Sequence, residues 1–518
     1  MYHRKTPAKP TSKMSKITAT ISLQILICIF SLLLLTLPLH GNTQSTTDSE
    51  QIILLRLKQH WYNPPSISHW TPPKFPDSNS STHCNWPEIT CTNDSVTGLS
   101  LPNKTIAVTI PQFICDLKNL TVIDFHYNYI PGPFPTVLYN CSKLKHLDLS
   151  LNFFVGRIPG DVDRLSTRLR VLNLNGNNFT GDIPLAIGRF HELRVLRFFQ
   201  NELNGSFPPE IGNLSNLEML ELSDNAFLLM AIPSSFTQLR KLKQLWIKDS
   251  SLIGEIPVTI GNLTELEELD LSNNKLTGTI PSGLFLLKNL TKLYLYKNHL
   301  SGAIPWPIEA LKMQIIDLSQ NNLNETIPAD FGKLTMLSVL ALFENQLSGE
   351  IPETIGRLPS LRDVKLFNNN LSGTLPPDFG RYSKLRGFEI PSNHFTGKLP
   401  EHLCANGELL GVVAFDNNLT GELPNSLGNC SSLLIVRVHG NRLSGSIPAG
   451  LWTSSNLTIL MLSDNLFTGQ LPRTLAPSLR RLDISNNKFS GQLPSGLSSL
   501  KHLIAFSASN NFFSGTIC

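Results

Sequence analysis

The sequence predicts an α/β solenoid, a superhelix of stacked coils whose short parallel strands line a concave face. One unit of about 24 residues recurs along most of the 518-residue chain. Each unit holds a Leu-x-Leu pair, then an Asn, then Gly-x-Ile/Leu-Pro, as in residues 266–281. Such a regular period is typical of solenoids, because one repeat cannot bury its own hydrophobic face and the stacked repeats share one core.

The Asn that follows the Leu-x-Leu pair marks the register, and we call it the ladder residue. Offsets below are counted from it. There are eighteen ladder positions, with spacings of 22 to 25 residues: 104, 128, 152, 177, 201, 225, 250, 274, 298, 321, 345, 369, 393, 417, 441, 465, 487 and 511. Only Lys104 and Ser250 depart from Asn.

Each recurring position has a structural role. The Leu-x-Leu pair alternates inward and outward, so it predicts a short strand with one apolar side. The Asn amide both donates and accepts hydrogen bonds, so a stack of Asn can satisfy the turning backbone without buried charge. Gly permits unusual dihedral angles and Pro then fixes φ. Strands about 4.8 Å apart in eighteen repeats give a concave surface on the order of 80 Å long.

These repeats resemble the plant-specific class of leucine-rich repeats, which implies a twisted superhelix. Ahead of them, residues 49–61 form an amphipathic helical pattern, and "CNWPEITC" places Cys84 and Cys91 on either side of Trp86. This segment resembles the N-terminal cap of plant leucine-rich-repeat receptors, and the resemblance implies a Cys84–Cys91 disulfide. We therefore expect a helical, disulfide-bonded cap over 46–92 and repeats over 93–518.

Four further cysteines have a duplicated spacing. Cys115 and Cys141 lie 13 and 11 residues before their ladder residues, and Cys404 and Cys430 lie at the same two offsets. Stacked repeats would bring each pair close to the usual Cα separation of about 5.5 Å. In an exported protein this predicts two inter-repeat disulfides, each contributing about 3.5 kcal/mol by loop entropy. The alternative is four buried thiols.

Residues 1–45 have the order of a secretory signal peptide: a basic stretch, an apolar run over 21–39, and small polar residues where cleavage is expected. A retained signal anchor is the alternative, because the apolar run is close to spanning length. Fifteen Asn-x-Ser/Thr sequons also predict export and glycosylation. They are at Asn79, Asn93, Asn103, Asn119, Asn140, Asn178, Asn204, Asn213, Asn262, Asn289, Asn324, Asn370, Asn418, Asn429 and Asn456.

The other end of the sequence stops inside a repeat, with Cys518 where the pattern has Pro. We expect an incomplete last repeat and no C-terminal cap in this sequence. The expected location is the secretory pathway and then the extracellular side of the plasma membrane. Attachment would come from a span beyond Cys518 or from the retained leader, and the protein would be secreted if the chain ends there.

Several functional classes are excluded by composition and motifs. Five basic residues lie in the first 16 positions, so the remainder carries a net charge of about −1, which does not suit nucleic acid. The kinase-like triplet Asp-Phe-Gly occurs at 330–332 and 378–380, without a Gly-rich loop, a strand lysine or an HRD loop. We find no nucleophile motif and no metal-ligand spacing. The sequence predicts no catalytic site, no metal and no cofactor.

The strand pattern predicts which side chains face the concave surface, namely those at offsets −6, −4 and −2. From the second repeat onward, none of the twelve sequons lies at these offsets. Exposed aromatic and charged side chains in a row favour peptide binding, because they supply large contact area and donors. The candidates are Arg197, Phe199, Trp246, Lys248, Tyr294, Tyr296, Phe343, Lys365, Phe367, Glu389, Phe415, Arg437 and His439.

The region 46–518 resembles the ectodomains of the HAESA-like group of plant receptor kinases. The resemblance rests on the cap, the repeat count, both cysteine pairs and strings such as "AFDNNLTGELP" at 414–424. It implies a secreted peptide ligand on the concave face and a shorter leucine-rich-repeat co-receptor kinase. The group also uses an Arg-x-Arg pair to grip the peptide's C-terminal carboxylate. Here the matching triplet is Ile435-Val436-Arg437, so the first Arg is missing.

Two other classes of function fit the same residues. One is a receptor-like protein without a kinase, whose output depends on a partner chain. The other is a secreted decoy or inhibitor protein. The sequence downstream of Cys518 would discriminate among these alternatives, because a membrane span with a kinase, a span with a short tail, and a cap followed by a stop codon each define a different class.

Overall fold

The structure is a computed structural model that describes residues 49–72 and 82–515. The chain divides into two units, Met1–Ser49 and Glu50–Cys518, and the second holds every described residue except Ser49. The predicted leader, the sequon at Asn79 and the terminal Cys518 lie outside the described residues. Within the described residues, no helix has both the length and the apolar character needed to span a membrane.

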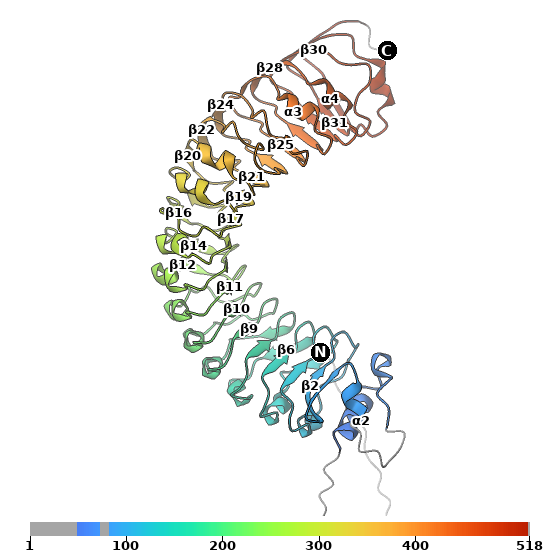
Figure 1. Cartoon of the computed structure of the whole chain (residues 1–518), viewed down its shortest axis with the longest axis vertical. Coiled ribbons are helices and arrows are strands. Elements are labelled where there is room, and N and C mark those ends of the chain that lie inside the picture. Colours follow the sequence, from blue (N-terminus) through green and yellow to red (C-terminus); the bar gives the residue numbers. More distant parts are fainter. Residues whose placement is uncertain (1–48, 73–81, 516–518) are drawn as a thin grey trace, which may run out of the picture. The chain divides into compact units, whose positions relative to one another are not determined.

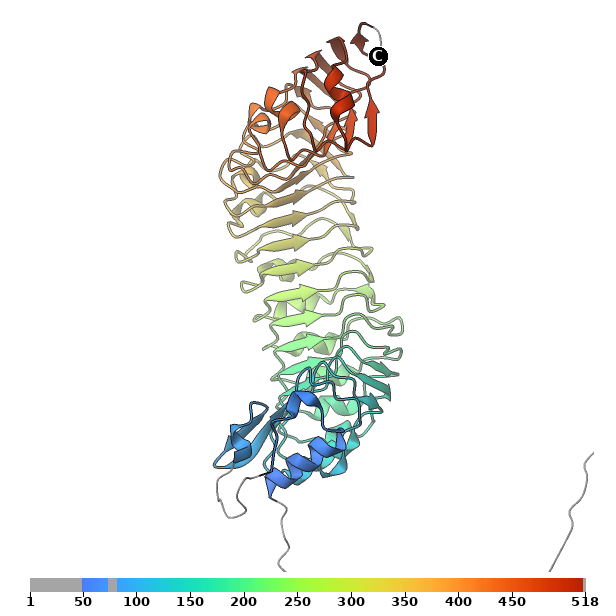
Figure 2. The ribbon, with the colours of Figure 1, turned by 90° about the vertical axis from the view of Figure 1, so that its right-hand side faces the viewer.

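One 19-stranded sheet runs through the second unit. Its first strand, β1 (Ile89–Thr92), pairs with β2 in antiparallel orientation, and the other eighteen strands are parallel, one for each ladder position. Figure 1 shows these strands along the inner side of the unit, and Figure 2 shows them stacked in order. The eighteen strands are β2 (Ser95–Ser100), β3 (Val122–Asp124), β5 (His146–Asp148), β7 (Val171–Asn173), β9 (Val195–Arg197), β10 (Met219–Glu221), β11 (Gln244–Trp246), β13 (Glu268–Asp270), β15 (Lys292–Tyr294), β17 (Ile315–Asp317), β19 (Val339–Ala341), β21 (Asp363–Lys365), β23 (Gly387–Glu389), β25 (Gly411–Val413), β27 (Ile435–Arg437), β29 (Ile459–Met461), β31 (Arg481–Asp483) and β33 (Ala505–Ser507).

Shorter parallel sheets follow the turn in most repeats. They are β4 (Pro131–Gly132), β6 (Phe153–Arg157) and β8 (Asn178–Thr180); β12 (Ile253–Glu255) and β14 (Lys275–Thr277); β16 (Ser301–Gly302) and β18 (Asn322–Leu323); β20 (Ser348–Gly349), β22 (Asn370–Thr374) and β24 (His394–Thr396); and β26 (Thr420–Gly421), β28 (Arg442–Ser446), β30 (Leu466–Gln470), β32 (Lys488–Gly491) and β34 (Phe512–Phe513). In several repeats the Gly of the Gly-x-Ile/Leu-Pro segment lies inside the strand, as Gly156 does in β6 and Gly373 does in β22.

Single helical turns complete the coils, and most are 3₁₀ helices because Pro precedes a stretch of about five residues that is too short for a stable α-helix. They are η3 (Gln112–Asp116), η4 (Thr136–Asn140), η5 (Val162–Arg164), η6 (Leu185–Arg189), η7 (Pro209–Asn213), η8 (Ser234–Gln238), η9 (Val258–Asn262), η10 (Ser282–Leu286), η11 (Ala329–Lys333), η12 (Glu353–Arg357), η13 (Ser495–Ser499), α3 (Asn425–Gly428) and α4 (Ala449–Thr453). The predicted α/β solenoid with a parallel inner sheet is confirmed.

The cap before the repeats holds α2 (Glu50–His60), η1 (Pro65–Ile67), η2 (Thr82–Asn85) and β1. Trp70 and Trp86 stack with ring centroids 5.1 Å apart. Beneath them the buried Glu88 accepts hydrogen bonds from Trp70 Nε1 at 3.1 Å and Lys104 Nζ at 2.7 Å. The departure of Lys104 from Asn thus has a physical reason: this ladder position joins the first repeat to the cap.

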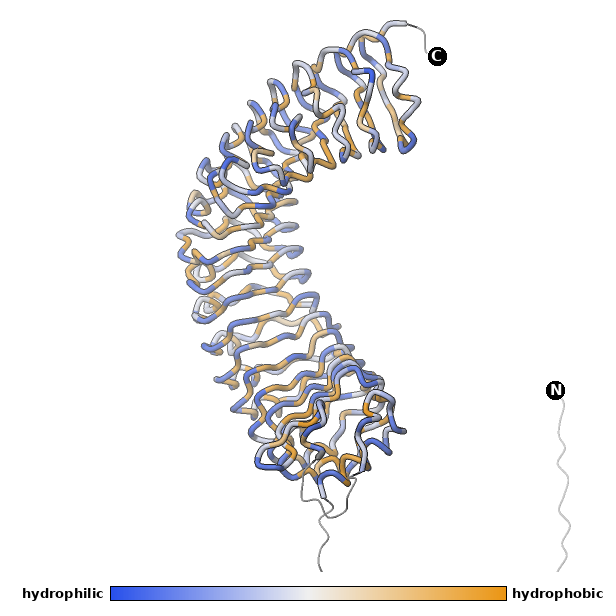
Figure 3. Tube along the Cα trace, turned by 45° about the vertical axis from the view of Figure 1, so that its right-hand side comes forward, coloured by the Kyte–Doolittle hydropathy of each residue, from blue (hydrophilic) through white to orange (hydrophobic). Residues whose placement is uncertain are grey.

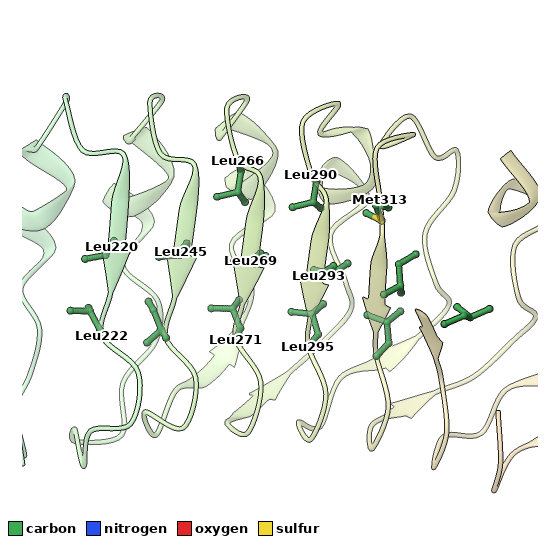
Figure 4. Packing of buried hydrophobic residues seen from close by; sticks show 14 of the residues in the cluster. Leu220, Leu222, Leu245, Leu266, Leu269, Leu271, Leu290, Leu293, Leu295 and Met313 are labelled. Carbon is green, nitrogen blue, oxygen red and sulfur yellow. The ribbon is translucent and has the colours of Figure 1, made fainter. Parts of the chain in front are cut away.

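One continuous hydrophobic cluster extends from Ile53 to Leu500. In β13 the central residue, Leu269, is buried and its two neighbours are partly exposed, and most of the inner parallel strands share this pattern. In β33 the central Phe506 is 38% exposed. Figure 4 shows Leu220, Leu245, Leu269 and other leucines at equivalent places in successive repeats. Figure 3 shows hydrophobic and hydrophilic stretches alternating within the coils. The last described repeat is more open: Ile504 is 75% exposed.

The ladder amides satisfy the turning backbone, as predicted. Nδ2 of the buried Asn298 donates to the carbonyl of Leu271 in the preceding repeat at 3.0 Å and to that of Leu295 in its own repeat at 3.1 Å. Its Oδ1 accepts from the backbone N–H of Leu276 at 3.0 Å. Ser250 keeps only the donor half of this pattern, because its hydroxyl donates to the carbonyl of Lys248 at 2.8 Å.

The residue before each ladder position adopts the left-handed backbone conformation in all eighteen repeats, which the sequence reading missed. At this offset φ is +53° at Asn103, +53° at Gln200 and +63° at Gly440. Asn, Asp and Gly tolerate this region best, and they occupy the offset in many repeats. The tight turn after each inner strand requires this conformation.

Three disulfides are present in the described residues. Cys84–Cys91 has a Cα separation of 5.6 Å within the cap. Cys115–Cys141 and Cys404–Cys430 join neighbouring repeats with Cα separations of 4.9 and 5.9 Å. These are the pairs expected from the family resemblance and from the duplicated spacing, and each inter-repeat bond closes against the next coil.

Candidate functional site

The parallel register places the side chains at offset −4 in one continuous row across the inner sheet. In order they are Ser100, Asp124, Asp148, Asn173, Arg197, Glu221, Trp246, Asp270, Tyr294, Asp317, Ala341, Lys365, Glu389, Val413, Arg437, Met461, Asp483 and Ser507. We call the surface formed by offsets −6, −4 and −2 the inner face.

All the candidate ligand-binding residues lie on this face, and each is partly exposed. None is buried in the core and none is fully exposed: Arg197, Phe199, Trp246, Lys248, Tyr294, Tyr296, Phe343, Lys365, Phe367, Glu389, Phe415, Arg437 and His439. Side chains that are half-buried before any ligand arrives lose little rotamer freedom when they bind one. The structure separates them into groups with different neighbours.

Arg197 is already engaged within the protein. Its Nε lies 3.1 Å from Oε2 of Glu221, and the Glu221 side chain is only 3% exposed. Burial raises the pKa of Glu221 above its ordinary value, although Arg197 opposes this shift. Glu221 was not among the candidates predicted from the sequence. The sequence feature that could have identified it is an acidic residue at offset −4 next to Arg197, the basic residue at offset −4 of the preceding repeat. Much of the Arg197 charge is therefore compensated before ligand binding.

Several polar side chains surround Lys248 in the middle of the inner face. Burial opposes the charge on Lys248, but Tyr296, Asp224 and Asp270 outweigh it and hold the lysine pKa above its ordinary value. Trp246, in the strand just before Lys248, has a buried Nε1–H without a hydrogen-bond partner among the described residues. The middle repeats thus offer one unpaired donor beside a lysine that stays protonated at neutral pH.

Tyr294 lies between two half-buried carboxylates in the row, Asp270 and Asp317. Burial raises the pKa of both carboxyl groups, while hydrogen bonds from Ser272 and Ser319, respectively, lower it in part. Each aspartate accepts the backbone N–H of its serine through Oδ1, at 3.0 and 3.1 Å. These serine bonds hold the carboxylates in fixed positions beside the tyrosine ring.

Two stacked aromatic pairs lie further along the face. The rings of Phe343 and Phe367 have centroids 4.3 Å apart and an interplanar angle of 13°. Phe415 and His439 stack at 4.5 Å and 10°. Stacking covers one face of each ring, and all four side chains remain partly exposed on the inner face.

Arg437 completes the second aromatic group. Its guanidinium carbon lies 4.7 Å from the ring centroid of Phe415, in cation–π contact. Arg437 Nε and His439 Nδ1 are both buried and have no hydrogen-bond partner among the residues described. Burial lowers the pKa of His439, and the Arg437 charge lowers it further. A buried polar atom without a partner is costly, so Arg437 Nε is suited to donate to a bound molecule, and His439 Nδ1 to donate or accept according to its tautomer.

The sequons have positions that leave the inner face open. All fourteen within the described residues are at least partly exposed. Those from the second repeat onward lie at offsets −12, −9, +1 and +3. Glycans at these places would project from the flanks and from the side of the helical turns, so a chain could still reach the strand surface.

One cluster of metal-ligand residues occurs at the start of the inner face, where sequence analysis expected no metal. Ligand atoms of Asp124, His126 and Asp148 lie within 4.8 Å of one another. Hydrogen bonds account for this arrangement: His126 Nδ1 lies 2.7 Å from Asp124 Oδ1, and Asn173 donates to Asp148 at 2.8 Å. The other such group, at Cys84 and Cys91, includes a disulfide, whose sulfurs are not thiolate ligands.

Comparisons with known families and proteins give the same architecture. The family described as "Leucine-rich repeat region" matches residues 150–301, and "Leucine rich repeat N-terminal domain" matches 48–92. "Leucine Rich Repeat" matches 312–334, 360–382 and 478–500. Among curated proteins of Arabidopsis thaliana, the chain is 34% identical over 129 residues to "Leucine-rich repeat protein FLOR 1" and 34% identical over 117 residues to "Receptor protein-tyrosine kinase CEPR1". These matches cover 23% and 22% of this chain, but only 36% and 12% of those proteins.

Solved structures match over much more of the chain. The ectodomain of the Arabidopsis receptor kinase HAESA, in complex with the peptide hormone IDA and the co-receptor SERK1, is 37% identical with a TM-score of 0.85. This match covers 91% of the present chain and 79% of that one. The crystal structure of a TDR receptor is 33% identical, with a TM-score of 0.77 and coverage of 81% and 77%.

The cap, the inner sheet and the disulfide-linked repeats define a leucine-rich-repeat ectodomain. With these matches, the chain belongs to the family of plant leucine-rich-repeat receptor ectodomains. Within that family it is similar to the HAESA ectodomain over 91% of its own length.

Proposed function

We propose that this chain is the extracellular ligand-binding region of a plant cell-surface receptor. It binds a secreted peptide along the inner face and signals through a shorter leucine-rich-repeat co-receptor kinase. The HAESA complex, which contains a peptide hormone and a co-receptor, supports the proposal by similarity. The chain spans 79% of that ectodomain but only 12 to 36% of the first curated relatives described above, so the kinase output is part of the proposal.

The observation that carries the proposal is the group formed by Phe415, Arg437 and His439. Two buried nitrogen atoms without partners lie beside an aromatic stack on a surface free of sequons. An acidic side chain or a terminal carboxylate of an extended peptide would accept a charge-assisted hydrogen bond from the Arg437 guanidinium. Ile435, in register with Gly411 and Ile459, adds no second cation at offset −6.

The remaining parts of the proposal follow from this role. The chain itself carries no catalysis, and it needs no metal or cofactor to bind a peptide. Residues 1–45 direct export, 46–92 cap the solenoid and 93–518 form the repeats. The binding surface faces the extracellular side of the plasma membrane.

Calorimetric titration of the secreted, glycosylated protein tests the proposal. The probes are synthetic copies of secreted plant peptides, each made once with a free and once with an amidated C-terminus. A charge-assisted hydrogen bond is worth roughly 1.5–3 kcal/mol, so Arg437→Ala should weaken binding about ten- to a hundredfold. Lys501→Ala, on an exposed turn away from the inner face, is the control and should bind as the wild type does.

The paired probes identify the group that Arg437 meets. If amidation weakens binding to wild type but not to Arg437→Ala, the arginine contacts the terminal carboxylate. Ile435→Arg should then strengthen binding of the free-carboxylate form. If wild type and Arg437→Ala bind a peptide with equal affinity, Arg437 is not part of the site. The binding site would then be expected in the repeats around Tyr294, Tyr296 and Phe343.

A further inference from the structure

Two neighbouring repeats carry an exposed apolar patch on the flank beside the inner face. It consists of Tyr127 (58% exposed), Tyr129 (53%), Leu151 (42%), Phe153 (53%) and Val155 (47%). The rings of Tyr129 and Phe153 stack with centroids 5.8 Å apart. We call these five residues the flank patch. A group of neighbouring exposed apolar side chains is typical of a surface that another group covers.

Two residues of the flank patch depart from the repeat pattern at a position where a bulky side chain strains the backbone. Tyr127 and Leu151 occupy offset −1, with φ of +57° and +53°. Every other repeat has Gly or a polar residue at this offset. A bulky residue in the left-handed region is unfavourable, so Tyr127 and Leu151 each carry a local backbone cost.

The neighbouring coil accommodates the patch rather than burying it. A Cβ atom at Gly176, the offset −1 residue of the next repeat, would come within contact distance of the Leu151 side chain. The absence of a side chain there lets Leu151 lean across the following coil. The apolar surface therefore reaches from the Tyr127 coil onto the Gly176 coil and stays open to solvent in the polypeptide alone.

Sequons border the flank patch on both sides. Asn103 is the offset −1 residue of the preceding repeat, and its backbone N–H donates to the His126 carbonyl at 3.1 Å, beside Tyr127. Asn178 lies in β8 directly in register with Val155 of β6. Asn103 is exposed and Asn178 partly so. In the unmodified chain Asn178 Nδ2 donates to Glu202 at 2.7 Å, and a glycosylated amide keeps one N–H for this bond.

The spacing of these sequons decides what can cover the patch. Asn103 and the Asn178 coil are three coils apart, which is about 14 Å at a strand spacing of about 4.8 Å. A stable protein interface needs about 800 Å² on each partner, so a glycan at either border would obstruct it. The same obstruction applies to a second copy of this chain. A sugar chain attached at the border meets no such obstacle, and its apolar ring faces can pack on aromatic side chains.

We propose that N-linked glycans on Asn103 and Asn178 pack over the flank patch and cover it. The sugars shield Tyr127, Tyr129 and Phe153 from water. In the other repeats the residues at offset −1 are Gly or polar and need no such cover. The inner face remains free for ligand binding, because both attachment points lie outside offsets −6, −4 and −2.

The test compares glycosylation-site variants of the secreted protein from a glycosylating plant or insect host. Asn103→Gln and Asn178→Gln remove the border sequons, singly and together, and Asn456→Gln removes a remote one as the control. Gln is compatible with both offsets, because Gln200 and Gln346 occupy them in this chain. Glycopeptide mass spectrometry measures site occupancy. Fluorescence of the apolar dye 8-anilinonaphthalene-1-sulfonate and sedimentation velocity measure exposed apolar surface and self-association.

The double variant should bind more dye and self-associate more than wild type, whereas Asn456→Gln should match wild type. Adding Tyr127→Asn and Phe153→Asn to the double variant should abolish the gain, which places the dye on the flank patch. Two results would overturn the proposal. One is an unoccupied Asn103 and Asn178 in the wild-type protein. The other is unchanged dye binding in the double variant although both sites are occupied in the wild type.

Discussion

Replacement of a single ladder amide in the middle of the solenoid should loosen the preceding turn. The side chain of Asn274 donates to the carbonyl of Ile247 at 2.7 Å and accepts the backbone N–H groups of Ser250 and Leu252, both at 3.0 Å. Asn274→Ala removes the acceptor and leaves both N–H groups buried without a partner. Each such loss costs about 1–3 kcal/mol, and partial relaxation brings the total to about 3 kcal/mol.

Hydrogen–deuterium exchange of the secreted protein, read by mass spectrometry, measures this effect where it occurs. A local loss of about 3 kcal/mol corresponds to roughly a hundredfold faster exchange for the segment holding Ser250 and Leu252. Lys275→Ala, at an exposed neighbouring position, is the control and should leave this segment unchanged. If Asn274→Ala exchanges no faster than the control, the ladder amide does not hold the turn and the structural role assigned to it is wrong.

Three further outcomes are expected. The pKa of His439 is lowered by burial, so a bound anion at its ring should raise that pKa, and peptide affinity should increase as pH falls from 7 to 5; His439→Gln should flatten this dependence in calorimetry. Burial raises the pKa of Glu88, but its hydrogen bonds outweigh burial and hold the pKa below its ordinary value. The ionised Glu88 therefore stabilises the folded protein fully above about pH 4.3, and this contribution is lost as the pH falls through the pKa of Glu88 in the folded state. Lys104→Ala should lower the free energy of unfolding by about 3 kcal/mol in thermal unfolding, and Glu88→Gln should lower it by a similar amount. Non-reducing peptide mapping should recover Cys404 joined to Cys430, and a free thiol at either residue would refute the register.

Much of the fold could be predicted because the repeat pattern has one physical solution. The Leu-x-Leu spacing determined which side chain of β13 is buried, and the ladder spacing determined which strands pair. The offset of Cys115 and Cys141 in adjacent repeats was enough to place them in contact across coils. These inferences needed only the period and the alternation of a strand.

Features that depend on side-chain geometry were not accessible in the same way. The left-handed turn at offset −1 appears in the sequence only as a weak preference for Asn, Asp and Gly. The pairing of Arg197 with Glu221 joins two repeats, and composition gives no indication that the carboxylate is buried. The unpartnered nitrogens of Arg437 and His439 also required coordinates, because they depend on what neither side chain reaches.

The central claim is that a peptide occupies the inner face, and hydroxyl-radical footprinting tests it most directly. A peptide identified by the titration above is added to the secreted protein, and oxidation of aromatic side chains is compared with and without it. Trp246, Tyr294 and Phe415 should be protected. Trp306, 75% exposed, and Tyr382, 52% exposed, should be oxidised equally in both samples. Unchanged oxidation of the inner-face residues, with protection of Trp306 or Tyr382 instead, would contradict the proposed binding surface.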